Sequence, residues 1–87
     1  MNIRNEDVRE VIVEIPEGHT HIRCTIELAD GSALTFNEAT VSNLLRAFVA
    51  VKTHPRTRRV TLRSVRLDER KNGYAEWQLL EVANEDV

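Results

Sequence analysis

The sequence is poor in cysteine, glycine and proline, and each shortage excludes a class of protein or a structural feature. Its single cysteine, Cys24, cannot form an internal disulfide, whereas secreted domains of this size normally carry several. Residues 1–7 are charged and lack the apolar stretch of a signal peptide, so we expect a cytoplasmic protein. Because the chain has only three glycines and two prolines, we also expect short loops.

Long apolar runs and aromatic side chains are scarce as well. The longest apolar run, residues 47–51, is far shorter than the ~20 residues that cross a bilayer, so we expect no membrane role. A composition of 41% hydrophobic and 30% charged residues is ordinary for a globular protein. The 87 residues therefore predict a single domain, 1–87, with a core over about 8–83 and frayed ends at 1–7 and 84–87.

Charge is strongly segregated along the chain, although the net charge is only −2. Residues 1–38 carry three bases against eight acids, a net −5, and residues 67–87 carry two bases against six acids, a net −4. The part between them holds seven bases and no acid. Those seven are Arg46, Lys52, Arg56, Arg58, Arg59, Arg63 and Arg66.

Hydrophobic periodicity predicts five strands and one helix. Alternating apolar and polar residues indicate strands, and apolar residues at helical spacing indicate the helix. The expected strands are 8–15, 20–28, 32–36, 58–67 and 74–82, and the expected helix is 38–52. We therefore predict an α+β fold of order β-β-β-α-β-β, in which a single helix packs on a mainly antiparallel five-stranded sheet.

The helix should begin after Asn37, a good N-cap residue, and end before the His54-Pro55 pair. Its apolar positions form one stripe that we expect to face the core. These positions are Val41, Leu44, Leu45, Phe48 and Val51. The opposite side is small and weakly polar, with Ala39, Ser42, Asn43, Arg46 and Ala50.

The apolar pattern also predicts how the strands pair. In the first hairpin, a four-residue loop places Val13 opposite Ile22 and Glu14 beside His21. In the second hairpin, a three-residue loop that ends with Gly31 in a left-handed conformation places Ile26 opposite Leu34 and Cys24 opposite Phe36. The third strand should then lie at an edge, with the C-terminal hairpin beside the first strand.

The same loop argument for the C-terminal hairpin gives a ribbon that is apolar on both faces. It places Val65 opposite Leu79 on one face, with Arg63 opposite Glu81, and Leu62 opposite Val82 on the other. If the helix covers the first face, a partner must cover the second, because a monomer rarely leaves such a patch in water. We therefore predict a homodimer interface at Val60, Leu62, Leu80 and Val82.

Two alternatives to this interface stay open. Bulges near 63–64 and 79–80 would bring the apolar residues of the hairpin onto a single face. The small-residue side of the helix, at Ala39, Ser42, Asn43 and Ala50, would be a different dimer surface.

No residues form a convincing catalytic or metal site. His19, His21, Cys24 and His54 invite a zinc site, but Cys24 is expected on the strand face opposite His21, among apolar residues. A thiol in such surroundings is inert as a nucleophile. We therefore expect no catalytic residue, no metal and no cofactor, and interpret the chain as a non-enzymatic protein-binding or assembly module that forms homodimers.

The basic segment, which we define as residues 52–66, supports a second hypothesis, nucleic-acid binding. Its exposed candidates for phosphate contacts are Lys52, Arg56, Arg58, Arg59 and Arg63. The competing interpretation is that these cations are neutralised within the fold, for example by a contact between Arg63 and Glu81. A third hypothesis is a small enzyme or ligand-binding domain whose site forms at a subunit interface.

Overall fold

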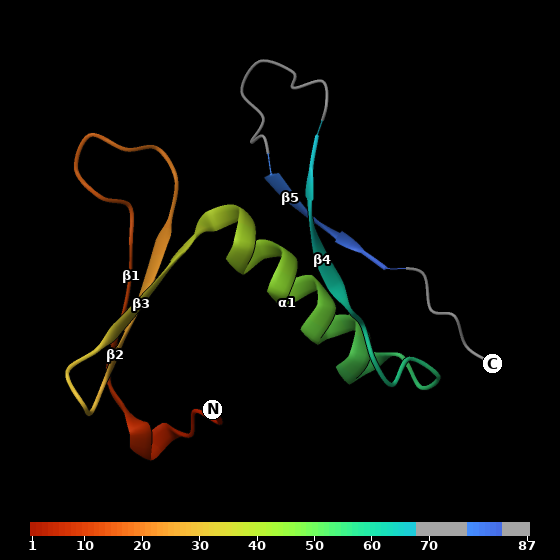
Figure 1. The fold of residues 1–87 in the computed structure, drawn as a ribbon, viewed down its shortest axis with the longest axis horizontal. Helices are drawn as coiled ribbons and strands as arrows, with labels where there is room; N and C mark the ends of the chain where they lie inside the picture. The colour runs from red at the N-terminus through yellow and green to blue at the C-terminus, as the bar shows by residue number, and fades with distance from the viewer. Residues whose placement is uncertain (68–76, 83–87) are drawn as a thin grey trace. The chain divides into compact units, whose positions relative to one another are not determined.

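The computed structural model describes residues 1–67 and 77–82 (Figure 1), and within them the expected elements follow one another in the expected order. Along the chain, a 3-10 turn and three strands precede the one helix, and two strands follow it. This confirms the α+β order β-β-β-α-β-β. The elements are η1 (Asn5–Asp7), β1 (Val8–Glu14), β2 (Arg23–Leu28), β3 (Ala33–Asn37), α1 (Glu38–Thr53), β4 (Leu62–Arg66) and β5 (Trp77–Glu81).

Strands β2 and β3 pair as the sequence predicts. Ile26 lies opposite Leu34, and Cys24 lies opposite Phe36. The loop between them closes with a hydrogen bond from Leu28 N to Ser32 O of 2.8 Å, and Gly31 adopts a φ of 93°. A residue with a side chain rarely adopts this left-handed conformation, so the glycine fixes the length of the loop and with it the register.

Strands β1 and β2 pair two residues away from the predicted register. Val13 lies opposite Cys24 instead of Ile22, and Val11 lies opposite Ile26. A shift of two residues leaves every side chain on its expected face, so the apolar pattern does not distinguish the two registers. The connection is correspondingly longer than the four residues expected, and it contains a tight turn in which His19 N donates to Pro16 O.

Strands β4 and β5 pair one residue away from the predicted register, and this shift does move side chains. Val65 lies opposite Gln78 instead of Leu79, and Leu62 lies opposite Glu81 instead of Val82. The prediction placed a three-residue loop at residues 71–73, which lie outside the described residues. The predicted β4-β5 register depended on the assumed length of that loop and not on the apolar pattern.

Hydrogen bonding divides the five strands into two antiparallel sheets, one of order β1-β2-β3 and one of β4-β5. The expected single five-stranded sheet is therefore not formed by the described residues, where β1 pairs only with β2. Strand β3 lies at an edge, as predicted. Apolar alternation identifies strands from local sequence, but it contains no information on which distant strands join.

The chain forms two compact units, residues 1–42 and 43–87. Leu28, with 6% of its surface exposed, is the only buried residue in the described part of the chain. The N-terminal unit contains the three-stranded sheet, and Ala29 N donates to Asp7 O to hold the 3-10 turn against it. Asp7, within the segment 1–7 that we expected to fray, thus forms a hydrogen bond with the turn that follows β2.

Helix α1 is the only helix of more than one turn among the described residues, and its 16 residues match the predicted range closely. Its last turn ends with hydrogen bonds from Thr53 Oγ1 to Val49 O and from His54 N to Ala50 O. Pro55 then prevents the helix from continuing. None of the helical segments described has the length and apolar character needed to cross a membrane.

Candidate functional site

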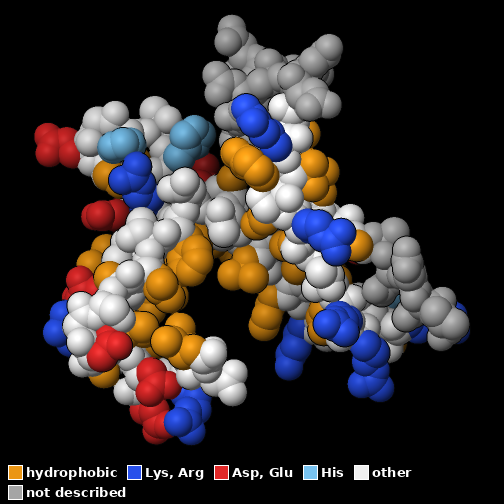
Figure 2. Space-filling model, viewed as in Figure 1, with side chains coloured by type: hydrophobic (Ala, Val, Ile, Leu, Met, Phe, Trp, Pro, Cys, Tyr) orange, Lys and Arg blue, Asp and Glu red, His pale blue; other side chains and the backbone are white. Residues whose placement is uncertain are grey.

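The three-stranded sheet has one apolar face, which we call the sheet face. It consists of two rows of side chains that cross the strands, Val11-Ile26-Leu34 and Val13-Cys24-Phe36. Ile26, Cys24 and Phe36 are half-buried, whereas Val11 and Leu34 are exposed and Val13 shows 64% of its surface. The sheet face is therefore open along both of its edge strands, and Figure 2 shows hydrophobic side chains at the surface of this unit.

The helix carries a second exposed apolar surface, the helix stripe, which consists of Leu44, Leu45, Phe48 and Val51. These four residues and Val41, which is half-buried, form the stripe that we predicted to face the core. All four side chains are exposed, and Phe48 shows 62% of its surface. The periodicity identifies which side of a helix is apolar, but it does not show that another element covers that side.

The half-buried positions of the helix are mainly small or polar. They include Thr40, Asn43, Ala47 and Ala50, with Val41 as the one large apolar residue among them. Of the side that we considered as an alternative dimer surface, Ala39 and Ser42 are exposed, whereas Asn43 and Ala50 are half-buried.

The β4-β5 ribbon is apolar on both faces, as predicted, but the faces have different members. Leu62, Leu79 and Trp77 share one face, and Val65 and Leu80 share the other. The predicted interface of Val60, Leu62, Leu80 and Val82 is therefore divided, because the observed register places Leu62 and Leu80 on opposite faces. Trp77 and Leu80 are exposed, one on each face.

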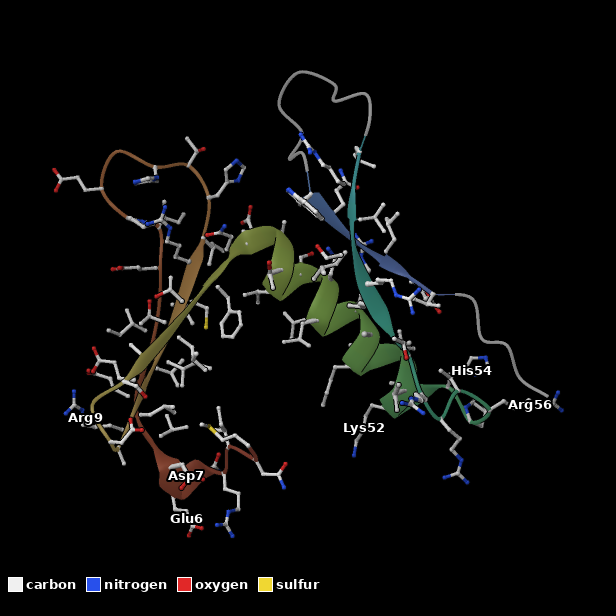
Figure 3. The ribbon with its side chains drawn as sticks, viewed as in Figure 1. Glu6, Asp7, Arg9, Lys52, His54 and Arg56 are labelled. Atoms are coloured by element: carbon white, nitrogen blue, oxygen red, sulfur yellow. The ribbon has the colours of Figure 1, made fainter. Side chains whose placement is uncertain are left out.

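Five cations of the basic segment are exposed and form no ion pair within the described part of the chain. The side chains of Lys52, Arg56, Arg58, Arg59 and Arg63 are all exposed. None of them forms an ion pair or a side-chain hydrogen bond with a described residue. Figure 3 shows Lys52 and Arg56 extending away from the end of α1 and from the loop that follows it.

The ion pair that we considered for neutralising this segment is not formed. Arg63 lies opposite Leu80, and Glu81 lies opposite Leu62, so the two charges are on different faces of the ribbon. The one-residue change of register is the cause.

The residues considered for a metal site do not converge. His21 Nδ1 forms a hydrogen bond of 2.8 Å with Glu38 Oε2 instead of lying beside Glu14, because β1 and β2 pair in a different register. His54 Nδ1 lies 3.0 Å from Thr57 Oγ1, and Cys24 lies on the sheet face. Among residues 1–67 and 77–82, no three metal-binding side chains are grouped in a way that would hold an ion.

The junction between β3 and α1 is a feature whose importance the sequence analysis missed. No residue separates the last residue of β3, Asn37, from the first residue of α1, Glu38. The Glu38 carboxylate is bonded to His21 at 2.8 Å and accepts a hydrogen bond from Ile22 N at 3.5 Å. The start of the helix is thereby attached to the segment that enters β2, within the N-terminal unit.

The turn before β3 contains the one carboxyl group among the described residues whose pKa is clearly displaced. The hydroxyl and the backbone amide of Ser32 both donate to Asp30 Oδ1, at 2.6 and 2.8 Å. These bonds stabilise the ionised form and hold the pKa of Asp30 below its ordinary value of 3.8. Asp30 is fully exposed, and its hydrogen bonds to Ser32 stabilise the turn. Its lowered pKa therefore reflects local structure and does not indicate a reactive group.

Comparisons with known proteins add no further assignment. No protein-family model matches the chain, and neither a curated protein nor a solved structure matches it either.

Proposed function

We propose that this chain is a small homodimeric assembly module that acts by binding protein and not by catalysis. The observation that supports the proposal most directly is the exposure of the sheet face and the helix stripe while only Leu28 is buried in the described residues. We further propose a cytoplasmic location, on the basis of the single cysteine.

The free energy at stake is large for a chain of this size. Complete burial of one large aliphatic or aromatic side chain contributes about 1.5–3 kcal/mol. Seven such side chains on the two surfaces are between 39% and 64% exposed, which leaves roughly 5–10 kcal/mol of hydrophobic stabilisation unrealised. Small domains have a total stability of about 5–15 kcal/mol, so covering these surfaces decides whether the fold is stable. The seven are Val11, Val13, Leu34, Leu44, Leu45, Phe48 and Val51.

The C-terminal ribbon supports the same proposal. A two-stranded antiparallel ribbon is at best marginally stable in water without further strands or a packed layer. Among the described strands, β4 and β5 pair only with each other, and the ribbon has exposed apolar residues on both faces. The predicted interface residues Val60, Leu62, Leu80 and Val82 thus stay candidates for contacts with a partner, on two faces instead of one.

Sedimentation velocity at low micromolar concentration tests the assembly. We expect the wild-type protein to sediment as a dimer and Val13→Glu to raise the dissociation constant at least tenfold, because Val13 is exposed in one chain and would be covered in the dimer. Thr35→Glu is the matched control, since Thr35 is exposed on the polar face of the same sheet. A monomeric wild type, or equal effects of the two substitutions, would contradict the proposal.

One second candidate, nucleic-acid binding, is favoured by five exposed cations that form no ion pair with a described residue. These are Lys52, Arg56, Arg58, Arg59 and Arg63. Exposed arginines without an acidic partner are suited to contact phosphates, and such binding weakens steeply as salt is raised. We expect binding of a random-sequence oligonucleotide at low salt to weaken in the Arg58→Ser/Arg59→Ser double variant. It should be unchanged in Arg9→Ser, since Arg9 is ion-paired with Glu27. Absence of binding at low salt would remove this candidate.

The hypothesis of a catalytic or ligand-binding site at a subunit interface stays a prediction for the assembled dimer. A crystal structure of the dimer with a polar cavity between the subunits would support it.

A further inference from the structure

We infer that Trp77 is a stacking platform for an unpaired base, so that the nucleic acid bound at the basic segment is single-stranded. The inference rests on nucleic-acid binding, the second candidate function, and specifies which form of nucleic acid binds and where a base lies. The platform is on strands β4 and β5, which pair with each other within the C-terminal unit.

The β4-β5 register places a large aromatic ring next to a cation. Trp77 lies opposite Arg66, and residues that pair directly in an antiparallel ribbon project from the same face with Cβ atoms about 4.5–5.5 Å apart. Trp77 is exposed. Ser64, also exposed, precedes Arg66 by two residues and therefore shares this face. One end of the ribbon thus presents an indole ring, a guanidinium group and a hydroxyl group on the same side.

These groups match what a single strand of nucleic acid presents. An unpaired base stacks on an aromatic ring through its free face, and the neighbouring phosphates accept hydrogen bonds from arginine and serine side chains. In a duplex each base is already stacked between its neighbours, so the ring of Trp77 has no free base face to contact. The combination of Trp77 with Arg66 therefore favours a single strand over a duplex.

Charge favours nucleic acid over a protein partner at this end of the ribbon. Residues 39–66 carry seven bases and no acid, and Arg58 and Arg59 are exposed in the segment that leads into β4. Such a density of cations attracts a polyanion, whereas the centre of a protein interface is depleted of charged residues. Glu81 shares the face of Trp77 but lies at the other end of the ribbon, so it confines the site to the end that carries Trp77.

Tryptophan fluorescence tests the inference directly, because Trp77 is the only tryptophan of the chain. Oligothymidine of about 12 nucleotides, oligouridine of the same length and a duplex of that length would each be titrated into the wild-type protein at low salt. Emission from Trp77 reports stacking, and the anisotropy of a labelled strand reports binding independently. Leu80→Ala is the matched control for Trp77→Leu, since Leu80 is exposed on the other face of the same ribbon.

We expect both single strands to quench the emission of Trp77 saturably and the duplex to leave it unchanged. Trp77→Leu should weaken single-strand binding at least fivefold, the effect of losing one stacked base, and Leu80→Ala should change it less than about twofold. Circular dichroism checks that each variant keeps its fold. If Trp77→Leu does not fold, quenching in the wild-type protein decides the question alone.

Three results would overturn the inference and leave nucleic-acid binding in place. They are binding without quenching, equal quenching by the duplex, and equal weakening in the two folded variants. Emission that changes with protein concentration and does not respond to either strand would show that a second copy covers Trp77, which also overturns the inference. Anisotropy that is unchanged with every oligonucleotide would refute nucleic-acid binding itself.

Discussion

Glu38 has two roles at the residue scale. It is the first residue of α1, where a negative charge favours the helix terminus, and its carboxylate is bonded to His21 and Ile22 N. The sequence predicted the first role, because an acidic residue after Asn37 is typical of a helix start. It did not predict the second, because that role depends on where the loop before β2 lies.

Asp30 shows how one hydrogen-bonded turn depends on pH. Its pKa is held below the ordinary value, mainly by the Ser32 hydroxyl and also by the Ser32 amide. A group with a lowered folded-state pKa contributes stability above its unfolded-state pKa, and this contribution is lost as the pH falls through the folded-state pKa. The bonds to Ser32 therefore stabilise the folded chain at neutral pH and cease to do so in strong acid.

We accordingly expect Asp30→Asn to lower the denaturation midpoint slightly at pH 7. The difference from wild type should shrink as the pH falls below about 4, where the unfolded-state carboxyl becomes protonated. Chemical denaturation followed by circular dichroism at a series of pH values measures this difference. Glu17→Gln is the control, since Glu17 lies in an exposed turn without an ionic partner in the described residues. A difference that is constant with pH, or equal to that of the control, would count against the role of Asp30.

At the scale of elements, local sequence determines most of what is found in the N-terminal unit. Gly31 and the apolar alternation together gave the correct β2-β3 register, because the glycine fixes the loop length independently. The β1-β2 register was wrong by two residues, since such a shift conserves the two faces. The β4-β5 register was wrong by one residue, because it depended on a loop assumed at residues 71–73.

The helix illustrates a different limit of sequence reasoning. Its range was predicted correctly, because the spacing of apolar residues and the His54-Pro55 pair are local signals. The burial of its apolar stripe stays a prediction, because burial depends on a covering surface elsewhere in the molecule or in another copy. An exposed stripe with good periodicity is thus itself an indication of a missing partner.

At the scale of the whole molecule, each of the two units carries exposed apolar or basic side chains. The sheet face and the helix stripe carry exposed apolar residues, the ribbon has apolar residues on both faces, and five exposed cations of the basic segment form no ion pair with a described residue. The sequence indicated the two-faced ribbon and the segregation of charge. It did not indicate that the strands divide into two sheets, because local apolar periodicity does not show which distant strands pair.

The most direct test of the central claim, that folding of this chain is completed by association, is the concentration dependence of its unfolding. Thermal unfolding of the wild-type protein would be measured over about a hundredfold range of concentration, because a dimer that forms only from folded chains gains stability by mass action. We predict that the midpoint rises by several degrees across this range. A midpoint that is the same at every concentration, together with the mass of a monomer, would contradict the account.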